Sequence, residues 1–499
     1  MGTRGWGRWT IALVIGLLAP FVVPEALQSA SAASVCGPLD RPETGIAGDI
    51  PLTDQITGRA AEGYSCGLSL VGYSSLGGRG GNANMAWSGE CAYVTGDGVA
   101  VVDVRDPQHP RHVLTLHGAG ADDTLETIAT IAAPGRTLLA TGRYGFYGTR
   151  DAPVTAPVDI WDVADCRHPK RLLTVQFPGN VHNLTFSADG RTLWSTLPLQ
   201  AMDLSNLRRP KILPHIEQDL AASGHPSHFY AHEAVVSPDG RRLYVAGQLP
   251  LFTEELLVVD IEHWPAQPAR VVGSVPRPGH SIRPMTVKGK PYLLASDESI
   301  INLTAKGCLP DVLTPFGGAA YPAVIDLSNE RLPKVRGKIR LPINEPIHCA
   351  EQVLSGVNAG THYQDVDDPL DTTFAMVSAW NAGLRVSDVR DPAHPREVAY
   401  FNPGMYAPGA GSQGGALEQA WAHSRYVPET GHLWLTTQTG GFWVLELQPQ
   451  VRRALGLPSR PTLHPNGAPP RPAATRIAPV SLAGTTMATY CAISTARVL

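Results

Sequence analysis

The sequence lacks a block of basic residues, a CxxC pair and, beyond its first 33 residues, any apolar run long enough to cross a membrane. Its 40 Lys and Arg residues face 44 Asp and Glu residues, which gives a formal net charge of −4. Without a concentrated positive surface, neither nucleic acid nor an anionic membrane surface is a favoured partner. The missing apolar run predicts no transmembrane segment in the mature chain.

Sustained helical periodicity is also scarce, whereas glycine and proline are abundant, with 50 and 44 residues. This composition favours many short strands joined by tight turns over a helical or α/β domain. The Gly-rich stretch GGRGGNANMAW, residues 77–87, follows no α/β pattern. We therefore expect an all-β fold without a nucleotide cofactor.

Residues 1–33 have the features of a cleaved export signal: two arginines, the apolar run TIALVIGLLAPFVV and the small-residue stretch SASAAS. They predict a secreted, extracytoplasmic protein. Cys36 follows the signal, but Ala33 and Val35 do not resemble a lipobox, so lipoprotein anchoring is not expected. In an oxidising compartment the seven cysteines should include a few disulfides, with one cysteine left over and the pairing open.

One short string recurs along the chain, most clearly as VAVVDVRDPQHPR, VDIWDVADCRHPK and LRVSDVRDPAHPR. Each copy is a β-branched strand that ends at an acidic residue and is followed by a proline-closed turn. The acidic residues are 41 to 66 positions apart: Asp103, Asp162, Asp203, Asp260, Asp326, Asp388 and Glu446. A second strand pair with a Gly turn precedes most copies. Four strands per unit at this period, in seven copies, predict a seven-bladed β-propeller.

The repeats divide the chain into four parts. We expect the signal at 1–33, an N-terminal linker at 34–62, the propeller at 63–449 and a flexible Pro-rich tail at 450–499. The seventh unit lacks an outer strand, while a spare strand, CGLSLVGYS, precedes the first unit. We predict that this N-terminal strand closes the last blade, which removes an exposed sheet edge.

The unit resembles the LVIVD repeat of bacterial exported proteins, whose consensus ends in a strand, D-x-S-D-P-x-x-P and another strand. The segments AYVTGDGVAVVDVRDPQHPRHV and FAMVSAWNAGLRVSDVRDPAHPREV match it best. The resemblance spans about residues 63–449 and implies the propeller fold, with very little about activity and nothing about oligomeric state.

Histidines recur at one position of the expected inner strands. Each lies twelve residues before the start of the second strand: His182 before Trp194, His232 before Tyr244, His280 before Tyr292, His362 before Phe374 and His423 before Leu435. In blade two this position is Thr127, next to Glu126. Because the first strand of each blade lines the central channel, the five imidazoles should converge at one channel mouth.

Long insertions fall on the same face, where binding residues usually sit on a rigid scaffold. We therefore expect a small-molecule or protein ligand there. Carboxylates that orient the rings are available at Glu126, Glu233 and Asp365, with Glu126 preferred. Further candidates for the second shell or for ligand binding are Asp297, Glu298, His348 and Trp380.

Neutral imidazoles from separate strands suit a transition metal such as Cu, Fe or Zn. In this placement of histidines on the inner strands of a propeller, the chain is similar to two groups of histidine-metal propellers, the carotenoid-cleaving oxygenases and the selenium-binding and methanethiol oxidase family. It shares no further motif with either, so their substrates do not carry over. A metal-free ligand site and a merely polar channel lining both remain open. A hydrolase that uses a carboxylate-bound divalent cation is disfavoured because the inner positions are histidines rather than acids.

Two functions follow from these patterns. One is an exported metalloprotein, and if it is an enzyme, a metal-dependent oxidoreductase acting on a small molecule at the histidines. The other is a non-catalytic propeller that binds a protein or a glycan through its long loops.

Overall fold

The computed structural model describes residues 36–143, 155–225, 230–248, 254–276, 279–296, 321–405, 417–461 and 463. The expected signal at 1–33 and most of the expected tail lie outside these residues. Among the described helices, none combines the length and the apolar composition that crossing a bilayer requires.

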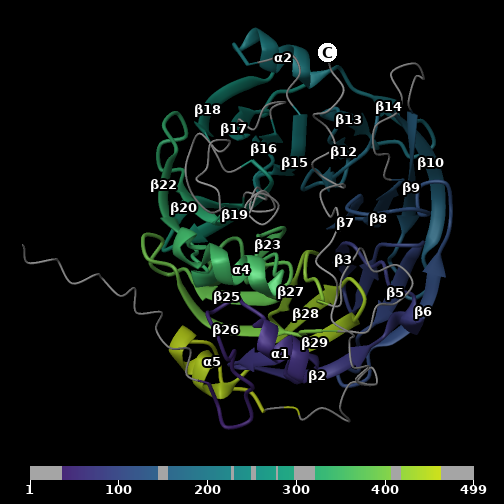
Figure 1. Cartoon of the computed structure of the whole chain (residues 1–499). Helices are drawn as coiled ribbons and strands as arrows, with labels where there is room; N and C mark the ends of the chain where they lie inside the picture. The colour runs from purple at the N-terminus through teal and green to yellow at the C-terminus, as the bar shows by residue number, and fades with distance from the viewer. Residues whose placement is uncertain are drawn as a thin grey trace, which may run out of the picture.

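The described strands form seven antiparallel sheets, which follow one another around a common centre (Figure 1). The protein is therefore a seven-bladed β-propeller, as the repeats predict. Blade 1 contains β3 (Met85–Ser88), β4 (Cys91–Val94), β5 (Val99–Asp103) and β6 (Arg111–Leu116). Blade 2 contains β7 (Ile128–Ala133), β8 (Arg136–Gly142), β9 (Thr155–Asp162) and β10 (Lys170–Pro178). Blade 3 contains β11 (Leu184–Phe186), β12 (Thr192–Ser195), β13 (Gln200–Asp203) and β14 (Lys211–Ile212).

The remaining blades continue the ring. Blade 4 contains β15 (Tyr230–Val236), β16 (Arg242–Gln248), β17 (Glu254–Asp260) and β18 (Arg270–Pro276). Blade 5 contains β19 (Ser281–Val287), β20 (Lys290–Ser296), β21 (Ala323–Asp326) and β22 (Lys334–Lys338). Blade 6 contains β23 (Gln364–Val366), β24 (Phe374–Ser378), β25 (Leu384–Asp388) and β26 (Arg396–Asn402). Blade 7 contains β27 (Arg425–Val427), β28 (His432–Thr437) and β29 (Gly441–Leu447).

The repeated acidic residue has a structural explanation. In six blades it is the last residue of the third strand, and its carboxylate accepts the backbone N–H two residues ahead, which starts the turn to the fourth strand. The six pairs are Asp103 with Arg105, Asp162 with Ala164, Asp203 with Ser205, Asp260 with Glu262, Asp326 with Ser328 and Asp388 with Arg390, at 2.8 to 3.1 Å. The repeat is therefore a turn signal.

Antiparallel pairing gives the ring two distinct faces. The turns from first to second and from third to fourth strand lie on one face, which we call the turn face. The inner strands begin on the opposite face, which we call the histidine face.

The N-terminal strand closes the ring, as predicted, and it does more. β2 (Leu68–Ser74) pairs with β29 as the outer strand of blade 7. The short β1 (Tyr64–Cys66) pairs with β26 and adds a fifth strand to blade 6. Only Gly67 separates the two strands; its φ is +69°, and a Cβ there would lie 2.6 Å from Val451. One continuous segment thus fastens blade 6 to blade 7.

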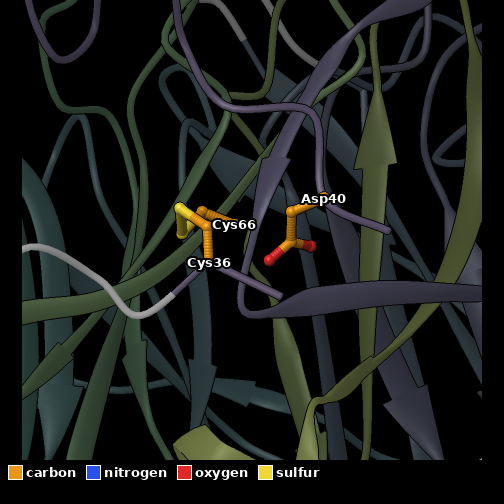
Figure 2. A group of neighbouring side chains, drawn as sticks. All are labelled: Cys36, Asp40 and Cys66. Carbon is orange, nitrogen blue, oxygen red and sulfur yellow. A yellow bond between two sulfur atoms is a disulfide. The ribbon is translucent and has the colours of Figure 1, made fainter. Parts of the chain in front are cut away.

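A disulfide and a carboxylate fix this crossover. Figure 2 shows Cys36 and Cys66 joined through their sulfurs, with Asp40 beside them. Asp40 accepts the backbone N–H groups of Gly37 and Gly67 at 2.6 and 2.8 Å, and the amide of Gln448 at 2.6 Å. Because both sulfurs are consumed by the disulfide, this group offers no thiolate for a metal. Cys91 and Cys166 form a second disulfide, and Cys349 is also disulfide-bonded.

The segment before the propeller is packed and is not a free linker. It contains α1 (Leu52–Thr57) and the 3₁₀ helix η1 (Arg59–Glu62), and it buries Ile50 and Ala60 completely. Glu43 of this segment forms a buried ion pair with Arg385 of β25. The interactions fasten the segment to blade 6.

The expected tail begins with packed residues. α5 (Pro449–Leu455) crosses the expected boundary at 449 and buries Val451 and Leu455 against blades 6 and 7. Arg390 donates to the last carbonyls of this helix. The other short helices are η2 (Leu76–Gly78), α2 (Ile216–Ala222), η3 (Pro342–Asn344), η4 (Pro346–His348) and α4 (Cys349–Ser355).

Candidate metal centre

Four of the five predicted histidines meet at the centre of the ring, and Glu126 joins them. Three of the histidines lie just before an inner strand: His280 directly before β19, and His182 and His362 two residues before β11 and β23. His232 lies within β15. His232 is the extra residue of a β-bulge, because Ala231 and Glu233 pair with consecutive residues of β16. We call Glu126, His182, His232, His280 and His362 the histidine cluster. None of its members is more than 4% exposed.

The ligand atoms of this cluster are close together. The Nε2 atoms of His182 and His232 are 2.7 Å apart, and they lie 3.4 and 3.9 Å from Oε2 of Glu126. The other carboxylate oxygen of Glu126 lies 3.6 Å from Nε2 of His362. Glu126 thus belongs to two sets of three donors, one with His182 and His232 and one with His280 and His362, each within 4.8 Å.

Hydrogen bonds between blades define the orientation of the rings. Nδ1 of His232 lies 3.0 Å from the carbonyl oxygen of His280, and Nδ1 of His280 lies 3.0 Å from that of His362. Nδ1 of His362 lies 2.7 Å from the carbonyl oxygen of Trp421. A carbonyl oxygen only accepts, so each Nδ1 carries the proton. In the neutral ring, Nε2 then keeps its lone pair, which is the arrangement of a metal-ligating histidine.

Hydroxyl groups of neighbouring blades hold the backbone at the same level. Thr127 donates to the carbonyl of His182 at 3.0 Å, Thr196 to that of His232 at 2.9 Å, and Ser296 to that of His362 at 3.1 Å. These three histidines are therefore fixed at their backbone carbonyls from the preceding blade of the ring. Such support preorganises the cluster.

The protonation states also suit a cation. Burial, followed by the neighbouring imidazoles of His280, His182 and His362, holds the pKa of His232 well below its usual range, so this ring is neutral. Tyr363 donates its hydroxyl to Oε2 of Glu126 at 2.5 Å. Burial and the charges of Glu126 and Glu233 hold the pKa of Tyr363 well above its usual range, so it remains a donor.

The donor set fits a transition metal. Imidazole nitrogen and carboxylate oxygen bind first-row divalent ions at about 2.0 to 2.2 Å, which places neighbouring ligand atoms roughly 3 to 3.5 Å apart. Two of the four observed separations, 3.4 and 3.6 Å, lie in or next to this range. The carboxylate of Glu126 would also offset part of the charge of a divalent cation.

His423 does not join the cluster, although it has the same sequence spacing. Its ring lies 3.2 Å from Asp365 and 2.6 Å from the guanidinium of Arg283. The imidazoles of His232 and His280 bond to the carbonyl of the histidine in the next blade. The imidazole of His362 instead bonds to the carbonyl of Trp421, which is two residues before His423. His423 therefore lies further along its strand than the other four histidines, next to a second group of polar side chains.

We call this second group the charge cluster; it consists of Glu233, Arg283, Asp365 and His423. Arg283 donates to Glu233 at 2.8 Å and to Asp365 at 2.9 Å. Burial would raise the pKa of Asp365, but the charges of His423 and Arg283 outweigh it and lower that pKa. Glu233 and Asp365 therefore balance the charge of Arg283.

The other predicted residues are distributed unevenly. Glu126 stands among the Nε2 atoms themselves and does not act behind them as an orienting group. Trp380 packs edge-on against His362, with ring centroids 4.9 Å apart. His348 belongs to η4, and no described contact connects it to the histidine cluster. Asp297 and Glu298 lie outside the described residues.

Sequence reasoning missed Tyr363, Arg283 and Trp421. Tyr363 follows His362 directly, and Arg283 is three residues after His280. In an inner strand the residues one and three places after the histidine point to the same side, so this spacing was the available signal. Trp421 offered none, because it contributes mainly a backbone carbonyl and an apolar surface.

No protein-family model matches the sequence, and no curated protein does. Among solved structures the chain is similar to the β-propeller domain of Cps50 (Swd1) from Myceliophteria thermophila, with a TM-score of 0.48 and 12% sequence identity. The match covers 74% of this chain and 97% of that domain. At this identity the similarity concerns the propeller fold alone.

Proposed function

We propose that the chain is an exported β-propeller metalloprotein that binds one transition-metal ion through the histidine cluster. The observation that carries this proposal is the meeting of four buried imidazoles and one carboxylate, in which the Nδ1 atoms of three rings bond to backbone carbonyls and thereby fix the tautomer of those rings. Imidazole nitrogens and a carboxylate oxygen that converge in this way form a donor set that suits a first-row transition-metal ion.

The number of donor groups narrows the choice of metal ion. Structural zinc sites take four ligands and catalytic zinc sites usually three. Four imidazoles and a carboxylate exceed both numbers and favour an ion that accepts five or six ligands, such as iron or copper. Because these ions are redox-active, the enzyme class that we propose is an oxidoreductase acting on a small molecule.

Two parts of the proposal come from the sequence. The features of residues 1–33 support export, and the strand–turn repeats support membership of the LVIVD repeat family. The disulfides Cys36–Cys66 and Cys91–Cys166 agree with an oxidising compartment.

A metal-free scaffold is the second candidate. The observation that favours it is the 2.7 Å contact between His182 and His232, which an N–H···N hydrogen bond also explains. In that case the histidines would line a polar channel, and the protein would act through its loops as a binding platform.

Metal analysis of tag-free protein separates the two candidates. We expect about one equivalent of iron or copper by plasma mass spectrometry in the wild type. Glu126→Gln should lower metal affinity at least about 100-fold, and His280→Ala should abolish stoichiometric binding, because both remove donors from the cluster. His394→Ala is the matched control, since this histidine is 83% exposed on the turn face.

The variants must retain the circular dichroism spectrum of the wild type. A wild type that binds neither Fe(II), Cu(II) nor Zn(II) after chelation and reloading would contradict the proposal. Equal metal content in Glu126→Gln, His280→Ala and His394→Ala would do so as well.

A further inference from the structure

Two indole rings flank the histidine cluster on one side. Trp380 and Trp421 lie 5.1 Å apart, and their ring centroids are 4.9 and 5.4 Å from that of His362. Ala83 completes the buried apolar group, and Leu125 packs against it. An apolar aromatic surface therefore directly adjoins a candidate metal ligand.

The two indoles differ in their hydrogen bonds. Trp421 donates its Nε1–H to the carbonyl of Asn82 at 3.1 Å. Trp380 is only 8% exposed, yet its Nε1–H has no acceptor among the residues that the structure describes. Leaving a buried donor unsatisfied is costly, and buried indoles usually find a partner. The unsatisfied donor therefore needs an explanation.

The backbone holds Trp380 in an unusual conformation. Its φ is +41°, which is unfavourable for a bulky residue. Its carbonyl accepts the N–H groups of Ala420 at 2.9 Å and Gly383 at 3.2 Å, which fix the turn. Strained positions of this kind concentrate at ligand sites, where the surrounding structure enforces them.

We propose that Trp380 positions the ligand of this centre, and that this ligand is an aromatic small molecule with an oxygen acceptor, such as a carboxylate or phenol group. The oxygen accepts the Nε1–H of Trp380, and the aromatic ring packs against the two indoles. An indole N–H can only donate, which requires an acceptor on the ligand. The aromatic surroundings favour a flat apolar body over a sugar or a polyol.

This inference rests on the proposed function, because it names the ligand class at the same centre. The test uses benzoate and acetate as probes, since they share a carboxylate and differ in the ring. Binding to metal-loaded protein is measured by isothermal titration calorimetry. We expect benzoate to bind at least about tenfold more tightly than acetate. Trp380→Phe, which keeps a ring and removes the N–H, should weaken benzoate binding about five- to tenfold at unchanged metal content.

Trp264→Phe is the matched control: it removes an indole N–H that already has an acceptor, Asp219, in the turn after β17 and away from the histidine cluster, and benzoate affinity should stay within about twofold of the wild type. Equal affinities for benzoate and acetate, or a Trp380→Phe variant that binds benzoate like the wild type, would overturn the inference while the metal content still supports the proposed function. If the protein takes up no metal, the proposed function fails first. Benzoate is then titrated into metal-free protein, where binding that depends on Trp380 keeps the inference and absent binding ends it.

Discussion

The two faces of the ring use histidines and acids in opposite ways. On the turn face His109, His168 and His394 are exposed, and each bonds to an aspartate three residues earlier in the same loop. On the histidine face the four rings and Glu126 are buried, and they come from five different blades. A histidine–aspartate pair within one loop requires only that its turn folds, whereas the histidine cluster forms only when the ring is closed. The motif that is most visible in the sequence therefore describes the scaffold, and the candidate chemistry lies at the opposite ends of the strands.

The largest difference between the faces should appear in the cost of removing an arginine. Arg283 holds the carboxylates of Glu233 and Asp365 inside the channel, and its side chain is only 19% exposed. Arg283→Met leaves both buried carboxylates without the guanidinium that they share. We expect the free energy of unfolding, measured by denaturant titration, to fall by about 3 to 5 kcal/mol.

Arg105→Met provides the matched control for that variant. Arg105 also pairs with an aspartate, Asp103, but its side chain is 46% exposed on the turn face. Exposed ion pairs contribute about 0 to 1 kcal/mol, so this variant should lose at most that amount. Similar losses in the two variants would show that the charge cluster is not the buried, coupled group that its distances suggest.

A smaller effect is expected from the hydroxyl that supports Glu126. Tyr363→Phe removes the donor to Oε2 of Glu126 without changing the ring that packs against His362. Groups that orient a metal ligand typically account for 10- to 100-fold in affinity. We expect metal affinity, measured by competition with a chelator, to fall about tenfold.

Tyr73→Phe tests whether this loss is specific. Tyr73 is also hydrogen-bonded, to the carbonyl of Gly440, but it lies in the outer strand of blade 7. Its removal should leave metal affinity unchanged. If Tyr363→Phe binds metal as tightly as Tyr73→Phe does, Tyr363 is not a positioning residue.

The fold was largely predictable because its signals are local and repeated. Asp103 and its five equivalents mark the end of the third strand, and together with Glu446 in β29 they give the number of blades. β1 could not be predicted, since three residues without a repeat carry no period, and its pairing with β26 depends on the closed ring. The same holds for Cys36 and Cys66, whose pairing depends on where that strand crosses from blade 6 to blade 7.

The site was predictable only as far as the strands share one register. Equal spacing identified the four histidines that meet, but it also included His423. In blade 7 the residue that accepts the hydrogen bond from His362 is Trp421, so His423 lies two residues beyond the equivalent position. Spacing within a blade contains no information about such a shift between blades. Glu126 was visible only as a neighbour of the vacant histidine position, and its direct contact with the imidazoles depends on how blade 2 faces blades 3 and 6.

The smallest expected effect concerns the seventh copy of the repeat, which carries Glu446 in place of aspartate. Its carboxylate accepts the backbone N–H of Leu463 at 3.1 Å, and burial raises its pKa to about 7, although that hydrogen bond and Arg452 act in the opposite direction. The folded state therefore keeps a proton up to a higher pH than the unfolded chain, whose carboxyl pKa is 4.5. The stability from this proton is fully present below pH 4.5 and is lost as the pH rises through about 7.

Glu446→Gln is neutral at every pH, so it should raise the free energy of unfolding by about 1 kcal/mol at pH 8 and change it little at pH 5. Glu90→Gln, an exposed change on the turn face, is the matched control, and parallel urea titrations of both variants at pH 5 and pH 8 would reveal whether the seventh turn differs from the other six.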